Sequence, residues 1–305
     1  MPPAAKLIGL SIVAAVAATA RPALADADSL VDNLGAREVG VGEAMRAGAI
    51  GATGPNLNPA GLPLTSELVF EGGYGYRGAD GASLFNLAVC DSTNAMPGCF
   101  YYDYMSSDPE LDGMALGHRR SHSGGLTLSR TVSPRVIVGV GAKYFDYSSD
   151  VMGEDSASGA NWDVGTLVRL TDLVNVAAVG YNLWGAKSVQ FPRAIGTGMM
   201  AHPLPALSAS FDAVWNLDAA DGAKTGRYGG GVEYFLSTRQ GTVGYPLRGG
   251  ALHDVATGGT YVTAGLGIST LKLGLDVGAR KQVADGDELL ITANLRFFGP
   301  RQPRQ

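Results

Sequence analysis

Apolar and polar residues alternate with a period of two through most of the chain after about residue 65, a pattern typical of β-strands with two different faces. The clearest example is Leu271–Arg280, within the expected strand Leu271–Lys281: its odd-numbered positions are apolar and its even-numbered positions carry charge or glycine. The preceding segment, Gly259–Ser269, alternates in the same way. A two-residue turn at Ser269-Thr270 would pair Ile268 with Leu271, and the apolar faces of the two strands would then coincide.

We expect fourteen such strands, an even number as in bacterial single-chain β-barrels. The long connection between Cys90 and Cys99 falls where a short turn is expected, so a count of twelve stays open. The expected strands are Glu67–Arg77, Ala82–Cys90, Cys99–Met105, Ser121–Thr131, Arg135–Ser148, Ala160–Leu170, Leu173–Trp184, Arg193–Ala201, Ala206–Leu217, Thr225–Ser237, Thr242–Gly250, Gly259–Ser269, Leu271–Lys281 and Glu288–Phe298.

Two features favour an all-β transmembrane antiparallel barrel over a soluble β-sandwich or β-solenoid. The polar faces of the strands are mostly glycine, serine and threonine, with few charges. Aromatic residues gather near the expected strand ends, as they do in the girdles of membrane barrels. The apolar face would then meet lipid and the polar face a lumen. The aromatic residues are Tyr144, Phe145, Tyr147, Tyr181, Trp184, Trp215, Phe297 and Phe298.

The composition agrees with this interpretation. The chain has 44 glycines among 305 residues, and only 17% of its residues are charged. Glycine is about 1 kcal/mol worse than alanine in a helix, which argues against a helical bundle. Many glycines fall on the expected lumen face, where small residues leave room for a plug. The net charge of −5, with its basic residues scattered, argues against nucleic acid as a partner.

The first 25 residues have the pattern of a signal peptide. Lys6 precedes the apolar stretch Leu7–Ala20, and Ala23-Leu24-Ala25 supplies small residues for cleavage before Asp26. The alternative, an N-terminal membrane anchor, needs about 20 apolar residues, more than this stretch has.

Export would place Cys90 and Cys99 in an oxidising compartment, where a disulfide between them is expected. Two free thiols or a metal pair are the alternatives. Neither a Cys-x-x-Cys motif nor a nearby histidine favours metal, and we expect no metal and no cofactor.

The segment before the first expected strand, residues 26–64, lacks the strand alternation and ends in Asn56-Leu57-Asn58-Pro59-Ala60-Gly61-Leu62. Here the chain resembles FadL-like and PorV-like outer-membrane barrels, which begin with an Ala/Gly-rich stretch ending in Asn-Pro-Ala-Gly directly before a run of strands. Leu247-Arg248-Gly249-Gly250, Glu233 in the strand before it, and the aromatic end of the last strand at Phe297-Phe298 also match.

The resemblance implies a hatch over residues 26–64 inside a barrel over residues 65–298, followed by a short polar tail over 299–305. It implies the bacterial outer membrane, its lipid and the barrel-assembly machinery as surroundings and partners. Phe297 is favoured over Phe298 as the assembly signal, because it shares the lipid face with Leu295. The hatch residues expected near a ligand are Asn56, Asn58, Pro59, Ala60 and Gly61.

Glu233 and Arg248 form a second candidate constellation. A two-residue turn at Gln240-Gly241 would make them direct neighbours on adjacent strands, both facing the lumen. The pair either lines a polar path or simply satisfies its own charges.

Three functions follow from these features. The first is a FadL-like passive channel for hydrophobic small molecules; the second is a PorV-like, non-conducting scaffold for secretion or surface assembly. The third, a lipase, would use His118 or His122 with Ser121 or Ser123. Because no family motif or partner acid accompanies these residues, we expect a solvated loop there and a protein that is not an enzyme.

Overall fold

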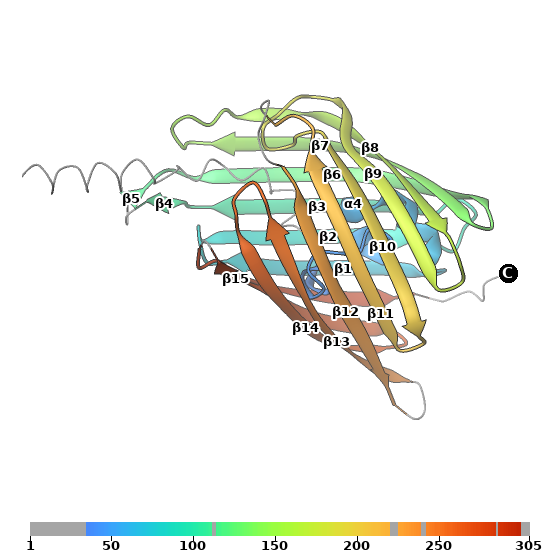
Figure 1. Cartoon of the computed structure of the whole chain (residues 1–305). Helices are drawn as coiled ribbons and strands as arrows, with labels where there is room; N and C mark the ends of the chain where they lie inside the picture. Colours follow the sequence, from blue (N-terminus) through green and yellow to red (C-terminus); the bar gives the residue numbers. More distant parts are fainter. Residues whose placement is uncertain (1–34, 112–113, 220–224, 239–241, 285, 300–305) are drawn as a thin grey trace, which may run out of the picture.

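The computed structural model describes residues 35–111, 114–219, 225–238, 242–284 and 286–299 (Figure 1). Within these residues, fourteen antiparallel strands form one closed barrel, in the order β1-β16-β15-β14-β13-β12-β11-β10-β9-β8-β7-β6-β3-β2. The first strand pairs with both β2 and β16, which closes the wall. The predicted fold class is therefore confirmed, with the larger of the two strand counts.

The barrel strands match the fourteen predicted segments to within a few residues at each end. The remaining two, β4 and β5, form a small hairpin of their own. The strand bounds are β1 Leu68–Arg77, β2 Ala82–Asp91, β3 Gly98–Ser107, β4 Glu110–Leu111, β5 Met114–Ala115, β6 Arg119–Ser133, β7 Val136–Ser149, β8 Ala157–Arg169, β9 Val174–Gly185, β10 Ala194–Leu204, β11 Leu207–Asn216, β12 Arg227–Ser237, β13 Val243–Asp254, β14 Thr260–Thr270, β15 Leu273–Ala284 and β16 Leu289–Phe298.

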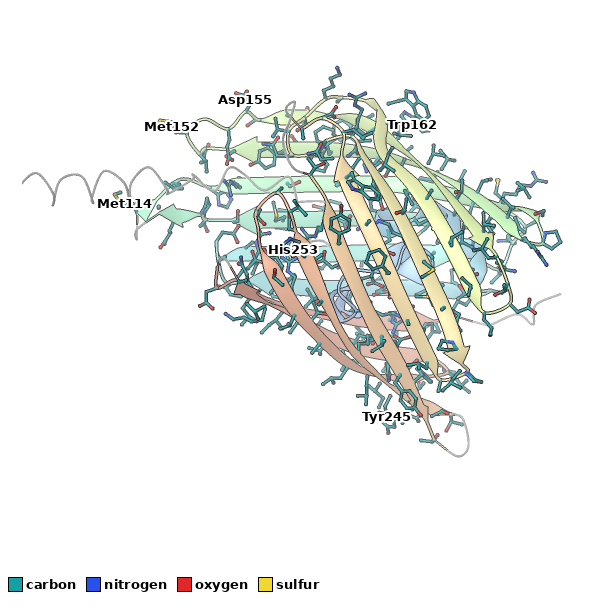
Figure 2. The ribbon with its side chains drawn as sticks, in the orientation of Figure 1. Met114, Met152, Asp155, Trp162, Tyr245 and His253 are labelled. Carbon is teal, nitrogen blue, oxygen red and sulfur yellow. A yellow bond between two sulfur atoms is a disulfide. The ribbon has the colours of Figure 1, made fainter. Side chains whose placement is uncertain are left out.

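The two faces of the wall differ as the alternation predicts. In β8, Asn161 and Asp163 point inward and are buried, whereas Trp162 between them points outward and is 47% exposed (Figure 2). A broad surface of exposed leucine, valine and aromatic side chains therefore surrounds the barrel, as expected for a wall that faces lipid. Among the described residues, no helix is both long and apolar enough to cross a membrane.

The predicted pairing of the strands around Thr270 is wrong by four residues. Ile268 lies opposite Leu275, not Leu271, because the chain makes a wider turn before β15. The Thr270 hydroxyl accepts hydrogen bonds from the backbone N–H groups of Lys272 (3.3 Å) and Leu273 (2.9 Å), which shapes this turn. Since the shift is an even number of residues, every side chain keeps its predicted face.

Part of the predicted aromatic girdle lies inside the barrel instead. Tyr144 is 58% exposed on the outer face, but its neighbour Phe145 and the next alternate residue, Tyr147, are buried in the lumen. Tyr181 is buried as well. These residues were assigned to the girdle because they lie near one another in the sequence. In a strand, however, adjacent residues point to opposite faces.

The two ends of the barrel carry different connections. We call one end the turn end; β1 begins and β16 ends there. At the other, the loop end, the β4–β5 hairpin projects beyond the wall (Figure 1). Connections at the turn end span residues 92–97, 134–135, 170–173, 205–206, 238–242 and 271–272, and those at the loop end span 78–81, 108–118, 150–156, 186–193, 217–226, 255–259 and 285–288.

Residues 35–64 lie within the barrel as four short helical turns, surrounded by the strands (Figure 1). They are α3 (Ala36–Gly40), η1 (Gly51–Thr53), α4 (Gly54–Leu57) and η2 (Pro59–Leu64). We call residues 35–64 the hatch from here on. The predicted signal peptide and residues 26–34 of the expected hatch lie outside the described residues, so those boundaries stay predictions.

A closed hydrogen-bonded barrel should resist detergent until it is heated. We expect the unheated protein to migrate faster in a dodecyl sulfate gel than the boiled protein, because the barrel stays compact and binds less detergent. Identical mobility before and after boiling, for protein refolded in detergent or lipid, would contradict a closed barrel.

Candidate functional site

Asn58 forms hydrogen bonds both within the hatch and to the barrel wall. It is fully buried and caps η2, with its side-chain oxygen accepting a hydrogen bond from Ala60 N (2.9 Å). Its Nδ2 donates to the backbone oxygens of Arg46 (3.0 Å) and of Thr166 in β8 (3.3 Å). The following proline favours the extended backbone that Asn58 needs for this capping position.

The rest of the Asn-Pro-Ala-Gly motif fits closely against three strands. Pro59 O accepts a hydrogen bond from Ser129 Oγ of β6 at 2.5 Å. A Cβ at Gly139 of β7 would lie 2.3 Å from Pro59 C, and one at Gly165 of β8 would lie 2.1 Å from Asn58 Oδ1. Gly61 is also required, because its Cβ would lie 1.8 Å from Ala49 O within the hatch. The motif therefore needs glycine on both sides of the contact.

The first part of the hatch meets a similar glycine surface on the opposite wall. A Cβ at Gly229 would lie 1.9 Å from Gly42 O, and one at Gly278 would lie 2.3 Å from Ala36 O. The hydroxyl of Thr263 bonds this backbone too, accepting from Gly42 N at 3.0 Å and donating to Gly40 O at 3.2 Å. The hatch backbone thus packs directly on the wall, without a layer of side chains between them.

Three charged hatch side chains are each paired with the wall. Arg46 is held by Asp212 of β11, through its backbone N (2.8 Å) and Nη1 (3.0 Å). Its Nε donates to the Tyr181 hydroxyl (2.8 Å), which donates in turn to Leu57 O (2.5 Å). Arg46, Asp212 and Tyr181 are all buried, so the pair is closed to bulk solvent.

Glu43 binds two arginines of the wall, Arg227 on β12 and Arg280 on β15. Its carboxylate accepts from Arg227 Nη2 (2.8 Å) and Arg280 Nη1 (2.5 Å). Arg280 also donates to Glu288 at the loop end (2.5 Å). Glu43 has a positive φ of 61°, as does Gly42 before it, at 67°. Such a backbone is rare for a residue with a side chain, and here it aims the carboxylate at both guanidinium groups.

The third pair involves the predicted constellation of Glu233 and Arg248. The structure places these residues directly opposite each other on β12 and β13, with Arg248 Nε 2.6 Å from Glu233 Oε2. Glu233 also accepts from the hatch residue Arg37 at 3.0 and 3.1 Å. Arg248 donates to Asp276 (2.6 Å), which Arg296 binds as well. Glu233 is therefore shared between the wall and the hatch.

Asn56 and the two cysteines, which were also predicted as site residues, lie away from the ion pairs described above. Asn56 donates to Asp103 of β3 at 3.1 Å, beside a small cavity. Cys90 and Cys99 form a disulfide between β2 and β3, and it packs on Leu62 of the hatch.

The two aromatic residues at the end of β16 point in opposite directions. Phe297 faces outward and lies 6.2 Å, ring to ring, from Phe70 of the first strand. Phe298 lies under the guanidinium of the inward-facing Arg296.

The residues of the lipase alternative do not meet. Ser121 and Ser123 are buried on the inner face of β6, whereas His122 lies on the outer face, with Nδ1 2.7 Å from the Tyr102 hydroxyl. His118 precedes the strand and binds Asp108 at 2.7 Å. Across the described ranges, no three histidine, cysteine or acidic side chains are arranged to hold a metal ion.

Apolar surface accompanies the hatch through the lumen. Ala60 packs with Ile137 and Leu167 next to the Asn58 contact. A larger group joins hatch residues to both sides of the wall: Val39, Val41, Met45, Ala47, Ala49, Leu57, Leu84, Met105, Ala177, Met200 and Leu290. Near the turn end, a cavity of about 440 Å³ is lined by Ile50, Leu64 and Met200 together with Arg37 and Arg169.

Arg37, Glu43 and Arg46 were not predicted as site residues. The signal that could have found them is the presence of four charged residues, Glu38 being the fourth, within ten residues of an otherwise Ala/Gly-rich segment. Their charged wall partners lie more than 160 residues away along the chain, and only a closed barrel brings them together.

These features define an outer-membrane-type β-barrel whose lumen is filled by a segment of its own chain. No family model and no curated protein matches the sequence. Solved structures with this fold include the Pseudomonas putida toluene transporter TodX, 11% identical over 87% of this chain and 97% of that one, with a TM-score of 0.67.

The monoaromatic hydrocarbon channel CymD is 12% identical over 88% of this chain and 99% of that one, with a TM-score of 0.62. A Pseudomonas aeruginosa FadL homologue is 10% identical over 87% and 98%, also with a TM-score of 0.62. The chain therefore has the fold of FadL-type channels. The scaffold alternative receives no support from these comparisons.

The glycine contact under Asn58 can be tested by one substitution. We expect Gly165→Leu to lower the free energy of unfolding by about 1–3 kcal/mol, since the new side chain overlaps the hatch. Residues 35–64 should also become sensitive to protease in the folded barrel. The matched control is Gly249→Leu, because a Cβ there has no atom nearer than 4.0 Å. Equal protease resistance of both variants would argue against the close contact.

The shared carboxylate of Glu233 provides a second test. Glu233→Gln leaves Arg37 and Arg248 without their common counter-charge, and we expect a loss of about 3 kcal/mol in unfolding free energy. Asp218→Asn is the control, because its partner Arg193 is 45% exposed; such surface pairs contribute under about 1 kcal/mol. Urea unfolding in lipid measures both, and similar small losses would show that Glu233 does not hold the hatch.

Proposed function

We propose that the protein is a passive outer-membrane channel for hydrophobic small molecules, with residues 35–64 as its movable plug. The observation that carries the proposal is a closed barrel whose lumen is filled by the hatch. Ion pairs and the contacts of Asn58-Pro59-Ala60-Gly61 hold the hatch against the wall. The fold shared with TodX, CymD and the FadL homologue over nearly their whole length supports it.

The apolar residues along the hatch supply the surface that such a solute needs. Val39, Met45 and Leu57 pack against Leu84 and Met200 of the wall. If the hatch shifts, these side chains come to line the space it leaves. A lumen of charge and glycine alone would offer a hydrophobic solute no favourable contact.

The contacts that hold the hatch suit a plug that moves. Ion pairs in a protein interior give little net stability, because each charge loses its hydration when the pair forms. Water that follows the hatch rehydrates Arg46, Glu43 and Arg37, so their separation costs less than the pair distances suggest. The pairs then fix one resting position without making it permanent.

The orientation follows from the connections. Outer-membrane barrels place short turns toward the periplasm and longer loops outside, so the loop end faces the medium. Lipid surrounds the exposed apolar wall. The outward-facing Phe297 at the end of the last strand is the residue that the assembly machinery would recognise.

Uptake by reconstituted protein tests the function. Vesicles with a lipopolysaccharide outer leaflet exclude hydrophobic probes, so the protein should speed the entry of 1-N-phenylnaphthylamine above the rate of protein-free vesicles. A boiled, unfolded sample inserted at the same protein-to-lipid ratio is the control. If folded protein gave the protein-free rate, the channel proposal would be wrong.

A reversible lock tests the moving plug. A Cβ at Gly48 would lie 3.7 Å from Met200 Cγ of the wall, so cysteines at both positions are within reach of a disulfide. We expect Gly48→Cys with Met200→Cys to stop uptake when oxidised and to restore it on reduction. Each single variant, and the parent with its Cys90–Cys99 bridge, receive the same reductant. Equal uptake by oxidised and reduced double variants would show that uptake does not depend on movement of the hatch.

A further inference from the structure

An aromatic cluster lies inside the lumen near its loop end. Phe145 and Tyr147 of β7 point inward and are buried. Phe191, from the connection between β9 and β10, stacks on Phe145, with the ring centres 4.2 Å apart and the ring planes inclined by 28°. Ala157 and Ala186 complete the contact. Phe191 is only 2% exposed although it belongs to a connection, where side chains usually face solvent.

The connection is held in this inward position by a distortion of β9. The pairing of β8 and β9 shifts between Trp162 and Val164, and Asn182 adopts a positive φ of 53°. Asn182 Nδ2 donates to Pro192 O at 2.8 Å, directly after the inserted ring. The backbone N of Asn182 donates to Asp163 Oδ1 at 2.7 Å. The bulge therefore aims residues 191 and 192 into the barrel.

Tyr181, next in the chain to Asn182, contacts the hatch through Arg46 and Leu57. The same bulge thus touches both the connection that carries Phe191 and the plug.

Buried polar atoms lie beside the aromatic cluster. Ser123, directly opposite Phe145 on β6, is 5% exposed, and its hydroxyl has no hydrogen-bond partner. The Oδ1 atom of Asn161 on β8 is likewise buried without a partner. An apolar ring cannot supply the hydrogen bonds that these polar atoms lack.

We propose that Phe191 is a removable seal at the loop end, and that a planar aromatic solute displaces it by stacking on Phe145. The proposal rests on the channel function and names its gate and a class of solute. Aromatic rings separated by about 4–5 Å attract each other, and an entering ring reproduces this contact while Phe191 swings out to solvent.

The first experiment measures the seal without transport. The described residues hold no free cysteine, so Ser123→Cys adds a reporter inside the lumen. A membrane-impermeant maleimide should label it slowly in the parent and about tenfold faster or more when Phe191→Ala is added. Val189→Ala is the control on the same connection, because Val189 is 74% exposed. Equal labelling with Phe191 and with alanine at that position would overturn the proposal.

The second experiment tests the solute class. Gln190, beside the ring and 6% exposed, is replaced by cysteine to report outward movement of the connection. Benzyl alcohol should speed its labelling severalfold, and cyclohexylmethanol, the saturated counterpart, should not. No acceleration, or equal acceleration by both alcohols, would overturn displacement by an aromatic ring.

These labelling results separate the gate from the channel. If labelling changed as expected but the protein showed no uptake, Phe191 would be a movable seal and the channel proposal would be wrong. Uptake that is unchanged by Phe191→Ala, together with unchanged labelling, would keep the channel and remove the gate.

Discussion

The close fit between the hatch backbone and a glycine-lined wall is the constraint on which the rest of the structure depends. At Gly139, Gly165, Gly229 and Gly278 a single added carbon would overlap hatch atoms. Because the backbone lies so near the wall, three hatch charges come within hydrogen-bond distance of inward-facing partners. Part of the high glycine content that argued against helices thus lies where the wall meets the hatch.

The ion pairs between the hatch and the wall determine where the hatch lies in the lumen. Arg37, Glu43 and Arg46 each bind different residues of the wall, and together these contacts define one resting position of the hatch. Glu233 connects Arg37 to a chain of charges that continues through Arg248 and Asp276. Such an arrangement fixes geometry more than it stabilises the fold, which is what a plug that must also move requires.

Much of the fold was predictable, because a period of two identifies both the strand and its faces. All fourteen strands and the opposition of Glu233 and Arg248 follow from alternation and turn length. The error at Thr270 came from assuming the shortest turn, and it kept the faces because the shift was even. Phe145, Tyr147 and Tyr181 were misplaced because a cluster along the chain was treated as a cluster in space.

The site itself was only partly predictable. The Asn-Pro-Ala-Gly motif indicated a hatch, but the partners of Asn58 are backbone oxygens, which no residue type reveals. Phe191 lies in a connection without strand pattern, and only the bulge at Asn182 turns it inward. Contacts of this kind depend on barrel closure, which the local sequence does not encode.

Hydrogen–deuterium exchange of residues 35–64 in the folded, bilayer-embedded protein tests the central claim most directly. The account predicts that peptides from this segment exchange as slowly as peptides from the barrel strands. The reason is that their backbone is buried against the wall and hydrogen-bonded to it. Complete exchange at the earliest time point, with the strands still protected, would show that the lumen is not filled by this segment and would contradict the account.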